Sequence, residues 1–533
     1  MTAKSGTSTG YRLIGGRLGF VAILCVVLAY VVMAQGPGWN QNAHYSLVRS
    51  LSNGTPEIDR TRFETGDWYS TGDITFYGGH VYAAKAPGLA FASLPGYLPL
   101  KAADIWNSGD DTRMLWWLTL WTVVLPSAVM LLLVRQVADR LQPGTGTLVA
   151  VTLGLATLVL PFSTLYFAHL LSATLGFAAF AVLWYERQGP PRPELVAAGG
   201  LLAGLATSTE YPLAIIAAAI GLYAAWRKPF VSRAVTYAAG AVVGVLPLLL
   251  YQWWAFGSPT HFAYENVYGG LNRTGTFGVN APSFRVTTEL LFSTTGLLRL
   301  SPVLALATVG LVLLYRRGHR AEAVLAAGIS LAYLVYNSGY ETPFGGRSPG
   351  PRFLIAILPF LALGLGPIFA SRPLTTLLLA VVSIVLMVSV TVTHPIYASD
   401  GHWFARFSDQ DFSATVLSFF RNFTLDSDKL PSSTHWAPLL VFFVPVALAF
   451  ALALAEWPRK RPTSSDTLTG VACLAGWLAL QHVTPKLIAG NGVVRRDWGP
   501  ALTLLLTAAV AVVALALPRL FRAAPPPVRT RDS

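Results

Sequence analysis

Charged residues are scarce in this sequence, and their scarcity excludes an ordinary soluble protein. Of the 533 residues, 12% are charged and 53% are hydrophobic, and the mean hydropathy is +0.53. A soluble protein usually carries about twice that share of charge. The only two cysteines, Cys25 and Cys473, both lie in apolar stretches, so a disulfide framework is not expected. The alternation of apolar and polar residues typical of a membrane barrel is also missing.

Long apolar runs are what the sequence has instead, and each is long enough to cross a bilayer as a helix of about 20 residues. The first, 18–33, follows basic residues and is interpreted as an uncleaved span, because it is long for a signal peptide. Further spans are expected at 114–134, 147–161, 168–185, 195–209, 211–226, 234–255, 299–315, 321–337, 353–370, 374–393, 437–456, 467–483 and 499–517. The sequence therefore predicts an all-α, polytopic transmembrane helix bundle of about 12–14 spans.

The basic residues fall mainly on one side of this predicted membrane topology. The chain has 38 Lys and Arg against 25 Asp and Glu, a net charge of +13. With a cytoplasmic N-terminus and alternating spans, the short cytoplasmic loops take the whole basic excess, as the positive-inside rule expects. We therefore expect a multi-pass protein of a bacterial inner membrane with both termini in the cytoplasm. The net positive charge reflects this topology, and no nucleic-acid partner is expected.

The long polar loops gather on the opposite, extracytoplasmic face. The longest, 35–113, follows the first span directly. We expect the chemistry on this face, because loops rich in varied polar side chains commonly carry function. Within this loop, Pro87–Leu100 is apolar but too short to span, so it predicts a helix that lies in the membrane interface.

Two acids of this loop are the candidates for catalysis. Asp59 follows a short helix that QNAHYSLVRSL predicts, and Asp73 lies in a Gly-rich segment, TGDITFYGGH. A carboxylate at the membrane surface can act as general base on a hydroxyl nucleophile, and we assign this role to Asp59 or Asp73. The other acids of the loop are interpreted as a solvated surface.

Lys85 stands beside the apolar segment that follows it, and this arrangement suits a ligand with an anionic head and a hydrocarbon tail. A phosphate on a lipid is such a ligand. His80 and Tyr82 lie just before Lys85, and all three are assigned to the substrate. The alternative for Lys85 is a cation that merely reaches from the membrane interface into water.

A second cationic segment is YETPFGGRSPGPRF, in which Arg347 and Arg352 lie on a turn rich in glycine and proline. Arginine is suited to forked contacts with phosphate, so the pair is assigned to a phosphodiester or diphosphate. The alternative is an interfacial turn with ordinary anchoring arginines.

Three further residues are assigned to the substrate. Tyr264 and Glu265 lie in FGSPTHFAYENVYGG, whose aromatic side chains could stack on a sugar or form an ordinary aromatic belt at the membrane face. Glu210 lies at a tight turn between two spans, and an acid so near the bilayer is a functional candidate. Glu210 could also simply reach the outer surface.

No metal or cofactor is assigned. Asp73 and His80 form one acid–histidine pair, and HPIYASDGHW holds His394, Asp400 and His402. Neither group has the close HxxxH or CxxC spacing typical of a metal site. A divalent metal is therefore kept only as a minor alternative.

Four segments together resemble a known class of enzyme: WNQNAHYSLVRSL, TGDITFYGGHVYAAKAPG, YQWWAFGSPTHFAY and PFGGRSPGPRFLIAILP. They are similar to the GT-C glycosyltransferases, which include the dolichyl-phosphate-mannose–protein mannosyltransferases and the lipid A aminoarabinose transferases, and specifically to a bacterial branch of that class. The resemblance covers roughly residues 18–370. Characterised members often carry an Asp-Glu pair directly after the first span, whereas this chain has Asn40-Gln41-Asn42 there.

The resemblance implies a membrane enzyme that transfers a sugar from a polyprenyl-phosphate donor to a glycan, lipid or protein acceptor of the cell envelope, with inversion. It implies that an acid of the first outer loop, here Asp59 or Asp73, is the base, and that membrane lipid surrounds the fold. The expected organisation is a GT-C-like catalytic module at 1–393, an extracytoplasmic loop at 394–436, C-terminal transmembrane helices at 437–518 and a disordered cytoplasmic tail at 519–533.

Two other functions stay open from the sequence alone. A transporter or flippase of lipid-linked sugars would carry ionisable groups inside its spans, and the predicted spans hold almost none. A non-catalytic membrane scaffold could retain a transferase fold, since fold alone does not fix function.

Overall fold

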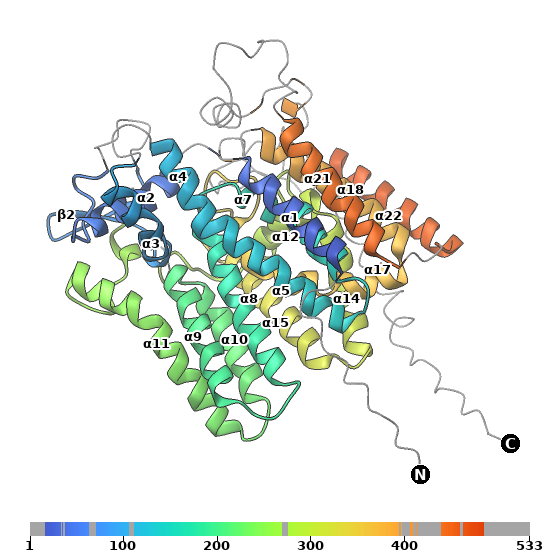
Figure 1. The fold of residues 1–533 in the computed structure, drawn as a ribbon, viewed down its shortest axis with the longest axis horizontal. Coiled ribbons are helices and arrows are strands. Elements are labelled where there is room, and N and C mark those ends of the chain that lie inside the picture. Colours follow the sequence, from blue (N-terminus) through green and yellow to red (C-terminus); the bar gives the residue numbers. More distant parts are fainter. Residues whose placement is uncertain are drawn as a thin grey trace.

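The computed structural model describes residues 16–33, 35, 38–62, 71–105, 111–268, 275–393, 396, 406–407, 409, 412, 439–458 and 462–483 (Figure 1). The α-helices are α1 Arg17–Val31, α2 Trp39–Ser52, α3 Gly88–Ala102, α4 Asp111–Thr119, α5 Leu125–Leu141, α6 Gly146–Leu155, α7 Val159–Phe162, α8 Ala168–Glu186, α9 Pro193–Thr209, α10 Leu213–Ala225, α11 Phe230–Phe256, α12 Phe284–Phe292, α13 Leu297–Leu300, α14 Val303–Arg316, α15 Arg320–Ser338, α16 Leu358–Ala362, α17 Leu365–Ser371, α18 Pro373–Val392, α21 Leu440–Glu456 and α22 Ser464–Val483. Three segments have another pitch: η2 Leu120–Val124 is a π-helix, and η3 Ala263–Asn266 and η5 Arg352–Ile357 are 3-10 helices.

The protein is a helical bundle that crosses the membrane several times. In the described residues, five helices are long and apolar enough to span, or up to seven if each of two bent helix pairs is one span. The bends are 89° within 284–316 and 52° within 352–371, and four further apolar helices are shorter. Each predicted span up to residue 483 coincides with a helix or a run of helices. The number 12–14 stays a prediction, because 499–517 lies outside the described residues, as do most of 394–436 and all of 519–533.

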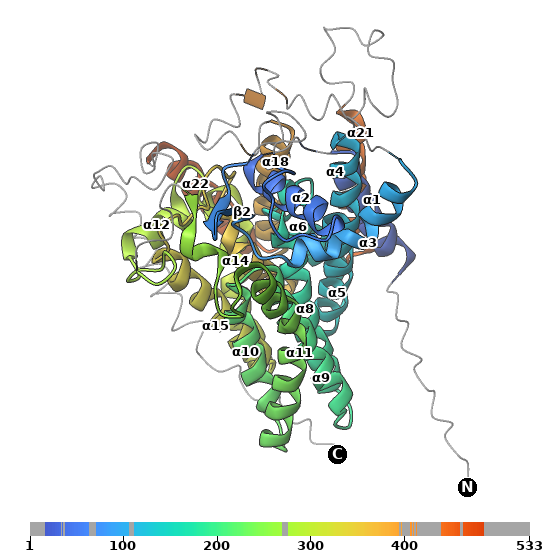
Figure 2. The same ribbon diagram turned by 90° about the vertical axis from the view of Figure 1, so that its left-hand side faces the viewer.

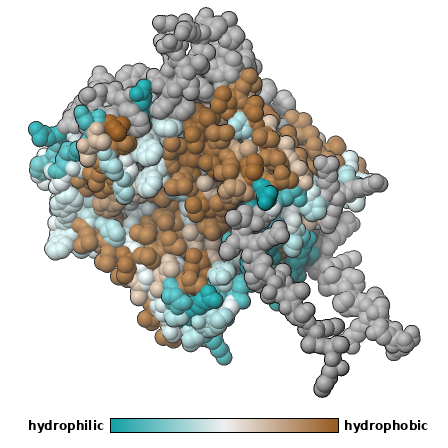
Figure 3. Space-filling model, viewed as in Figure 1, coloured by the Kyte–Doolittle hydropathy of each residue, from teal (hydrophilic) through white to brown (hydrophobic). Residues whose placement is uncertain are grey.

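The first-loop elements lie over one set of neighbouring helices. Figures 1 and 2 show α8, α9, α10 and α11 side by side. Away from them, α1 packs against α21 and α18 packs against α22. The loop elements α2, α3 and the strands lie above the ends of α9 and α11. A broad hydrophobic belt covers the face in Figure 3, with hydrophilic residues at its edges. In α11 only 22% of the most apolar window is buried, against 72% in α8, so α11 presents much of its surface to lipid.

Glycines let α9 and α11 touch backbone to backbone. Gly200 and Gly204 of α9 face Gly240 and Gly244 of α11, and a Cβ at any of the four would overlap a carbonyl oxygen of the other helix. Small residues four apart are a common means of close helix packing in membranes. There, no hydrophobic force drives two helices together, so close van der Waals contact must hold them. We call these four residues the glycine seam. It leaves no layer of side chains between the two helices.

A two-stranded antiparallel hairpin, which the sequence analysis did not anticipate, occupies the first loop. It pairs β1 Ile74–Tyr77 with β2 His80–Ala83. The turn residues Gly78 and Gly79 both have positive φ, 57° and 86°, the conformation of a type I′ hairpin turn that glycine adopts without strain. An isolated bridge from Thr75 to Val267 fastens the hairpin to the loop that follows α11.

Helix α3 occupies the apolar segment for which the sequence predicts an interfacial helix. It keeps Pro95 and Pro99 within its length. Its first residue, Gly88, lies so close to the last turn of α9 that a Cβ would meet the backbone of Thr209. On its other side, the indole nitrogen of Trp117 donates to the carbonyl of Gly96 at 3.0 Å. This packing fixes the start of α3, and therefore the residues just before it, against the bundle.

A buried ion pair ties α8 to α11 at the end of the bundle opposite the hairpin. The guanidinium of Arg233 donates to both carboxylate oxygens of Glu186 at 2.7 Å, and their side chains are 5% and 0% exposed. We expect Arg233→Met to lower the free energy of unfolding by about 3–5 kcal/mol, because it leaves a buried carboxylate without its main partner. Unfolding of the detergent-solubilised protein would measure this loss.

The control for this prediction is the double variant Glu186→Leu/Arg233→Met. Replacing both charges by apolar groups of similar size should recover most of the lost stability, because the remaining charged partner of Glu186, Arg227, is partly exposed and can be hydrated. A single variant as stable as the wild type would show that this pair does not hold the two helices together.

Candidate active site

Asp73 and Lys85 meet where the two strands of the hairpin leave the bundle. Asp73 lies just before β1 and Lys85 just after β2, and the amide of Ala84 donates to the carbonyl of Asp73 at 2.9 Å. The Lys85 ammonium is 3.0 Å from the Asp73 carboxylate, and both side chains are largely buried. The hydroxyl of Thr71 accepts from the Asp73 amide at 3.0 Å and holds the turn. The hairpin thus brings Asp73 and Lys85, which lie on either side of it in the sequence, into one ion pair.

The pKa of Asp73 lies below its usual value. Burial alone would raise this pKa, but the positive charge and hydrogen bond of Lys85, together with the positive charge of Arg352, outweigh burial. Asp73 is therefore a carboxylate at neutral pH, available to accept a proton.

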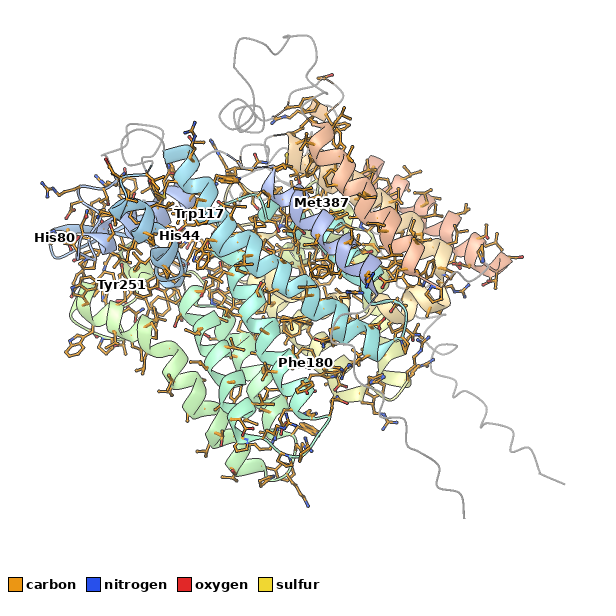
Figure 4. All side chains as sticks on the ribbon, viewed as in Figure 1. His44, His80, Trp117, Phe180, Tyr251 and Met387 are labelled. Carbon is orange, nitrogen blue, oxygen red and sulfur yellow. The ribbon has the colours of Figure 1, made fainter. Side chains whose placement is uncertain are left out.

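Asp59 and His80 form a separate pair at the turn end of the hairpin. The Asp59 carboxylate is 2.7 Å from Nδ1 of His80 and also accepts from the amide of Val81 at 2.8 Å. The His80 side chain is 57% exposed and that of Asp59 35%, and Figure 4 shows His80 at the outer edge of the molecule. The hydrogen bond to Asp59 raises the pKa of His80. The hairpin therefore separates the two candidate bases, with Asp73 near the bundle and Asp59 near solvent.

Arg352 is a buried cation that interacts electrostatically with Asp73. Its side chain lies at the start of η5 and is 9% exposed, with the guanidinium carbon 5.3 Å from the ring centre of Phe167 and 5.6 Å from that of Phe353. Its Nε has no hydrogen-bond partner among the described residues. Gly345, at φ 79°, passes so close that a Cβ there would overlap this nitrogen. Arg347, by contrast, is exposed. The structure thus buries one arginine of the predicted pair and exposes the other.

Glu210 belongs to a buried dyad with His169, a residue that the sequence analysis missed. The Glu210 carboxylate pairs with Nδ1 of His169 and accepts from the hydroxyl of Ser172 at 2.7 Å. His169 is 6% exposed, and its Nε2 has no hydrogen-bond partner among the described residues. The signal was available, because an ionisable residue at the start of a predicted span is a functional candidate.

His44 of α2 is a second histidine that the sequence analysis did not single out. It is buried, and its ring meets that of Tyr166 edge to face at 6.3 Å. Burial and, after it, the nearby positive charge of Lys85 lower the pKa of His44 to about 3, so the ring is neutral. The signal was the polar face of α2, where Gln41 and Asn42 are also buried.

The three remaining predicted residues, Tyr82, Tyr264 and Glu265, make contacts near the end of α11 or in the segment that follows it. Tyr82 is buried against Phe256, the last residue of α11, with ring centres 4.9 Å apart. Tyr264 packs edge to face on Tyr211 at 5.1 Å. Glu265 is exposed and accepts from the amide of Phe262 at 2.9 Å, which caps the short helix η3. Tyr82 and Glu265 thus have clear packing and capping roles, and their assignment to substrate stays a prediction.

Within the part of the chain that the structure describes, no three His, Cys, Asp or Glu side chains are grouped as a metal site would require. The predicted alternative cluster of His394, Asp400 and His402 lies outside those residues. The groups that do come together are Asp73 with Lys85, Arg352, and the dyad of His169 and Glu210. A carboxylate and two cations beside buried aromatic rings can together bind an anion and accept a proton from its reaction partner.

No protein-family model and no curated protein matches the chain. Among solved structures, it is similar to ArnT from Cupriavidus metallidurans bound to undecaprenyl phosphate, with 14% identity, a TM-score of 0.48, and coverage of 92% of this chain and 87% of that one. It is also similar to the Archaeoglobus fulgidus oligosaccharyltransferase in the apo form, with 12% identity, a TM-score of 0.39, and coverage of 90% and 61%. Both are enzymes of the GT-C class that the sequence resembles. Because both TM-scores lie below 0.5, the function proposed below rests on the site itself.

Proposed function

We propose that this protein is a membrane glycosyltransferase that moves a sugar from a polyprenyl-phosphate donor to an acceptor of the cell envelope, with inversion at the anomeric carbon. One observation supports this most directly. An ionised carboxylate, Asp73, lies within 3.0 Å of Lys85 and in the field of the buried Arg352, whose Nε lacks a hydrogen-bond partner within the described ranges. A base beside two cations suits a reaction that deprotonates a hydroxyl and releases a phosphate.

The reaction assigns one role to each group. Asp73 accepts the proton of the acceptor hydroxyl, whose oxygen forms a bond to the anomeric carbon. The bond between that carbon and the phosphate oxygen breaks, and its electron pair leaves with the polyprenyl phosphate. The departing phosphate gains one negative charge, which Lys85 and Arg352 oppose. Because this charge develops only as the bond breaks, both cations stabilise the transition state more than the bound donor.

The apolar helix α3 offers a surface for the hydrocarbon tail of the donor. It begins within a few residues of Lys85 and is apolar along most of its length. A phosphate held by Lys85 would therefore place its lipid tail beside α3 and the surrounding membrane lipid. The same arrangement favours an extracytoplasmic active face in the inner membrane, with both termini in the cytoplasm, as the charge distribution predicts.

The function can be tested with the purified full-length protein in proteoliposomes, supplied with a panel of radiolabelled polyprenyl-phosphate sugars and a cell-envelope extract. We expect one donor to give labelled, anomerically inverted product. Transfer of intact donor across the bilayer without cleavage would favour a flippase instead. Donor binding with neither cleavage nor translocation would favour a scaffold.

A further inference from the structure

His169 and Arg352 each present a buried nitrogen that has no hydrogen-bond partner in the described part of the chain, and they share two aromatic neighbours. The His169 ring stacks on Phe167 with centres 5.7 Å apart and meets Phe353 edge to face at 5.9 Å. Arg352 lies against the same two rings. The unpartnered atoms are Nε2 of His169 and Nε of Arg352. A buried polar atom without a hydrogen bond is costly, so two such atoms in one aromatic setting indicate a ligand that satisfies both.

The partners of His169 fix which of its nitrogens can carry a proton. Nδ1 faces the carboxylate of Glu210, whose other oxygen accepts from Ser172 at 2.7 Å. A carboxylate only accepts hydrogen bonds, so Nδ1 carries the proton in this pair. In the neutral ring Nε2 then has a lone pair, which repels an anion. Nε2 can donate to an anion only when the ring is an imidazolium.

From this geometry we propose that His169, held by Glu210, is a phosphate ligand beside Arg352, and that phosphate binding takes up one proton at its Nε2. The ligand class is the phosphate group of an isoprenoid phosphodiester or monoester. This inference rests on the proposed function and names a further residue for the same site. It gives the leaving phosphate a third positive charge, and that charge acts most strongly on the dianion that sugar transfer releases.

The charged and titratable groups around the dyad come from several elements. Glu210, between α9 and α10, pairs with Nδ1 of His169, and Arg352 of η5 interacts electrostatically with Glu210. His44 of α2 lies close enough to interact electrostatically with His169 and stays neutral. The charge of Asp73 reaches both Arg352 and His44. An arriving phosphate adds negative charge next to Arg352, so binding and protonation of His169 strengthen one another.

The test measures binding of farnesyl methyl phosphate, a phosphodiester that does not itself titrate between about pH 5 and 8, the range in which histidine does. The full-length protein in nanodiscs should bind this probe at least about tenfold more tightly at the acid end of that range, because a charge-assisted hydrogen bond forms there. His169→Gln should remove the pH dependence and weaken binding by about the same factor. His319→Gln, at the N-terminus of α15, is the matched control and should leave both unchanged.

Two further measurements keep the test decisive. Calorimetry of the wild type in buffers of different ionisation enthalpy should show proton uptake on binding at neutral pH, and no uptake would overturn the proposal even if the variant fails to fold. Inorganic phosphate, at one fixed pH, should compete only weakly. Competition as strong as that of the lipid would identify free phosphate as the ligand and overturn the isoprenoid assignment.

The two proposals can fail separately. pH-dependent binding without sugar transfer would refute the proposed function alone, whereas sugar transfer with pH-independent binding would refute the role of His169 alone.

Discussion

Asp73→Asn is expected to lower the rate of sugar transfer by roughly 10²–10⁴-fold, the usual contribution of a general base. The amide keeps the size of the side chain and cannot take the acceptor proton. The donor phosphate should still bind, because Lys85 and Arg352 remain, and Lys85 is then released from its ion pair with Asp73. Initial rates at saturating donor, together with donor binding in proteoliposomes, would separate lost chemistry from lost affinity.

Asp59→Asn is the matched comparison for this experiment. Asp59 lies at the exposed end of the hairpin, bonded to His80 and to the amide of Val81. Its replacement should loosen the hairpin turn and change the transfer rate by only a few-fold. If Asp59→Asn abolishes transfer and Asp73→Asn does not, the base has been assigned to the wrong end of the hairpin.

Arg352→Gln is expected to lower kcat/KM by roughly 10²–10³-fold, comparable to the loss of one preorganised group that stabilises developing charge. Arg352→Lys should recover only part of this loss, because an ammonium is a compact point charge and lacks the planar fork that contacts phosphate. Arg347→Gln is the control, because Arg347 is exposed on the same loop. Equal losses in the Arg347 and Arg352 variants would contradict the assignment of phosphate to the buried arginine.

Arg352→Gln should also change the pH dependence of transfer. The positive charge of Arg352 helps to hold the pKa of Asp73 below its usual value. Its removal therefore raises that pKa, and a larger fraction of Asp73 is protonated in mildly acidic buffer. The acid side of the pH–rate profile should move to higher pH in Arg352→Gln and stay in place in Arg347→Gln.

The sequence predicted the helices well because lipid imposes a simple rule. Every apolar run up to residue 483 coincides with a helix, since backbone groups in a bilayer must be satisfied within their own segment. The hairpin was missed although its signal was present: ITFY and HVYA, rich in β-branched and aromatic residues, flank Gly78-Gly79. The sequence analysis described this stretch only as a Gly-rich segment that holds Asp73.

The types of residue at the site could be predicted from the sequence, but which acid pairs with which cation could not. Asp73, Lys85 and Arg352 were chosen because acids and cations at a membrane face suggest phosphate chemistry. Which acid meets which cation depends on how the first loop folds back, and no local pattern encodes that. His169 was missed because it is a lone histidine in an otherwise apolar predicted span, and its partner Glu210 lies beyond the next helix, so no local pattern joins the two.

The glycine seam has a mechanical consequence for this site. α9 ends next to Glu210, and α11 ends at Phe256, on which Tyr82 of the hairpin rests. Because the two backbones touch directly, they cannot slide independently as they could across a soft layer of side chains. When a thinner or thicker bilayer tilts the lipid-facing α11, α9 tilts with it. Glu210 and Phe256 then move as one rigid unit, and the distance between them stays independent of membrane thickness.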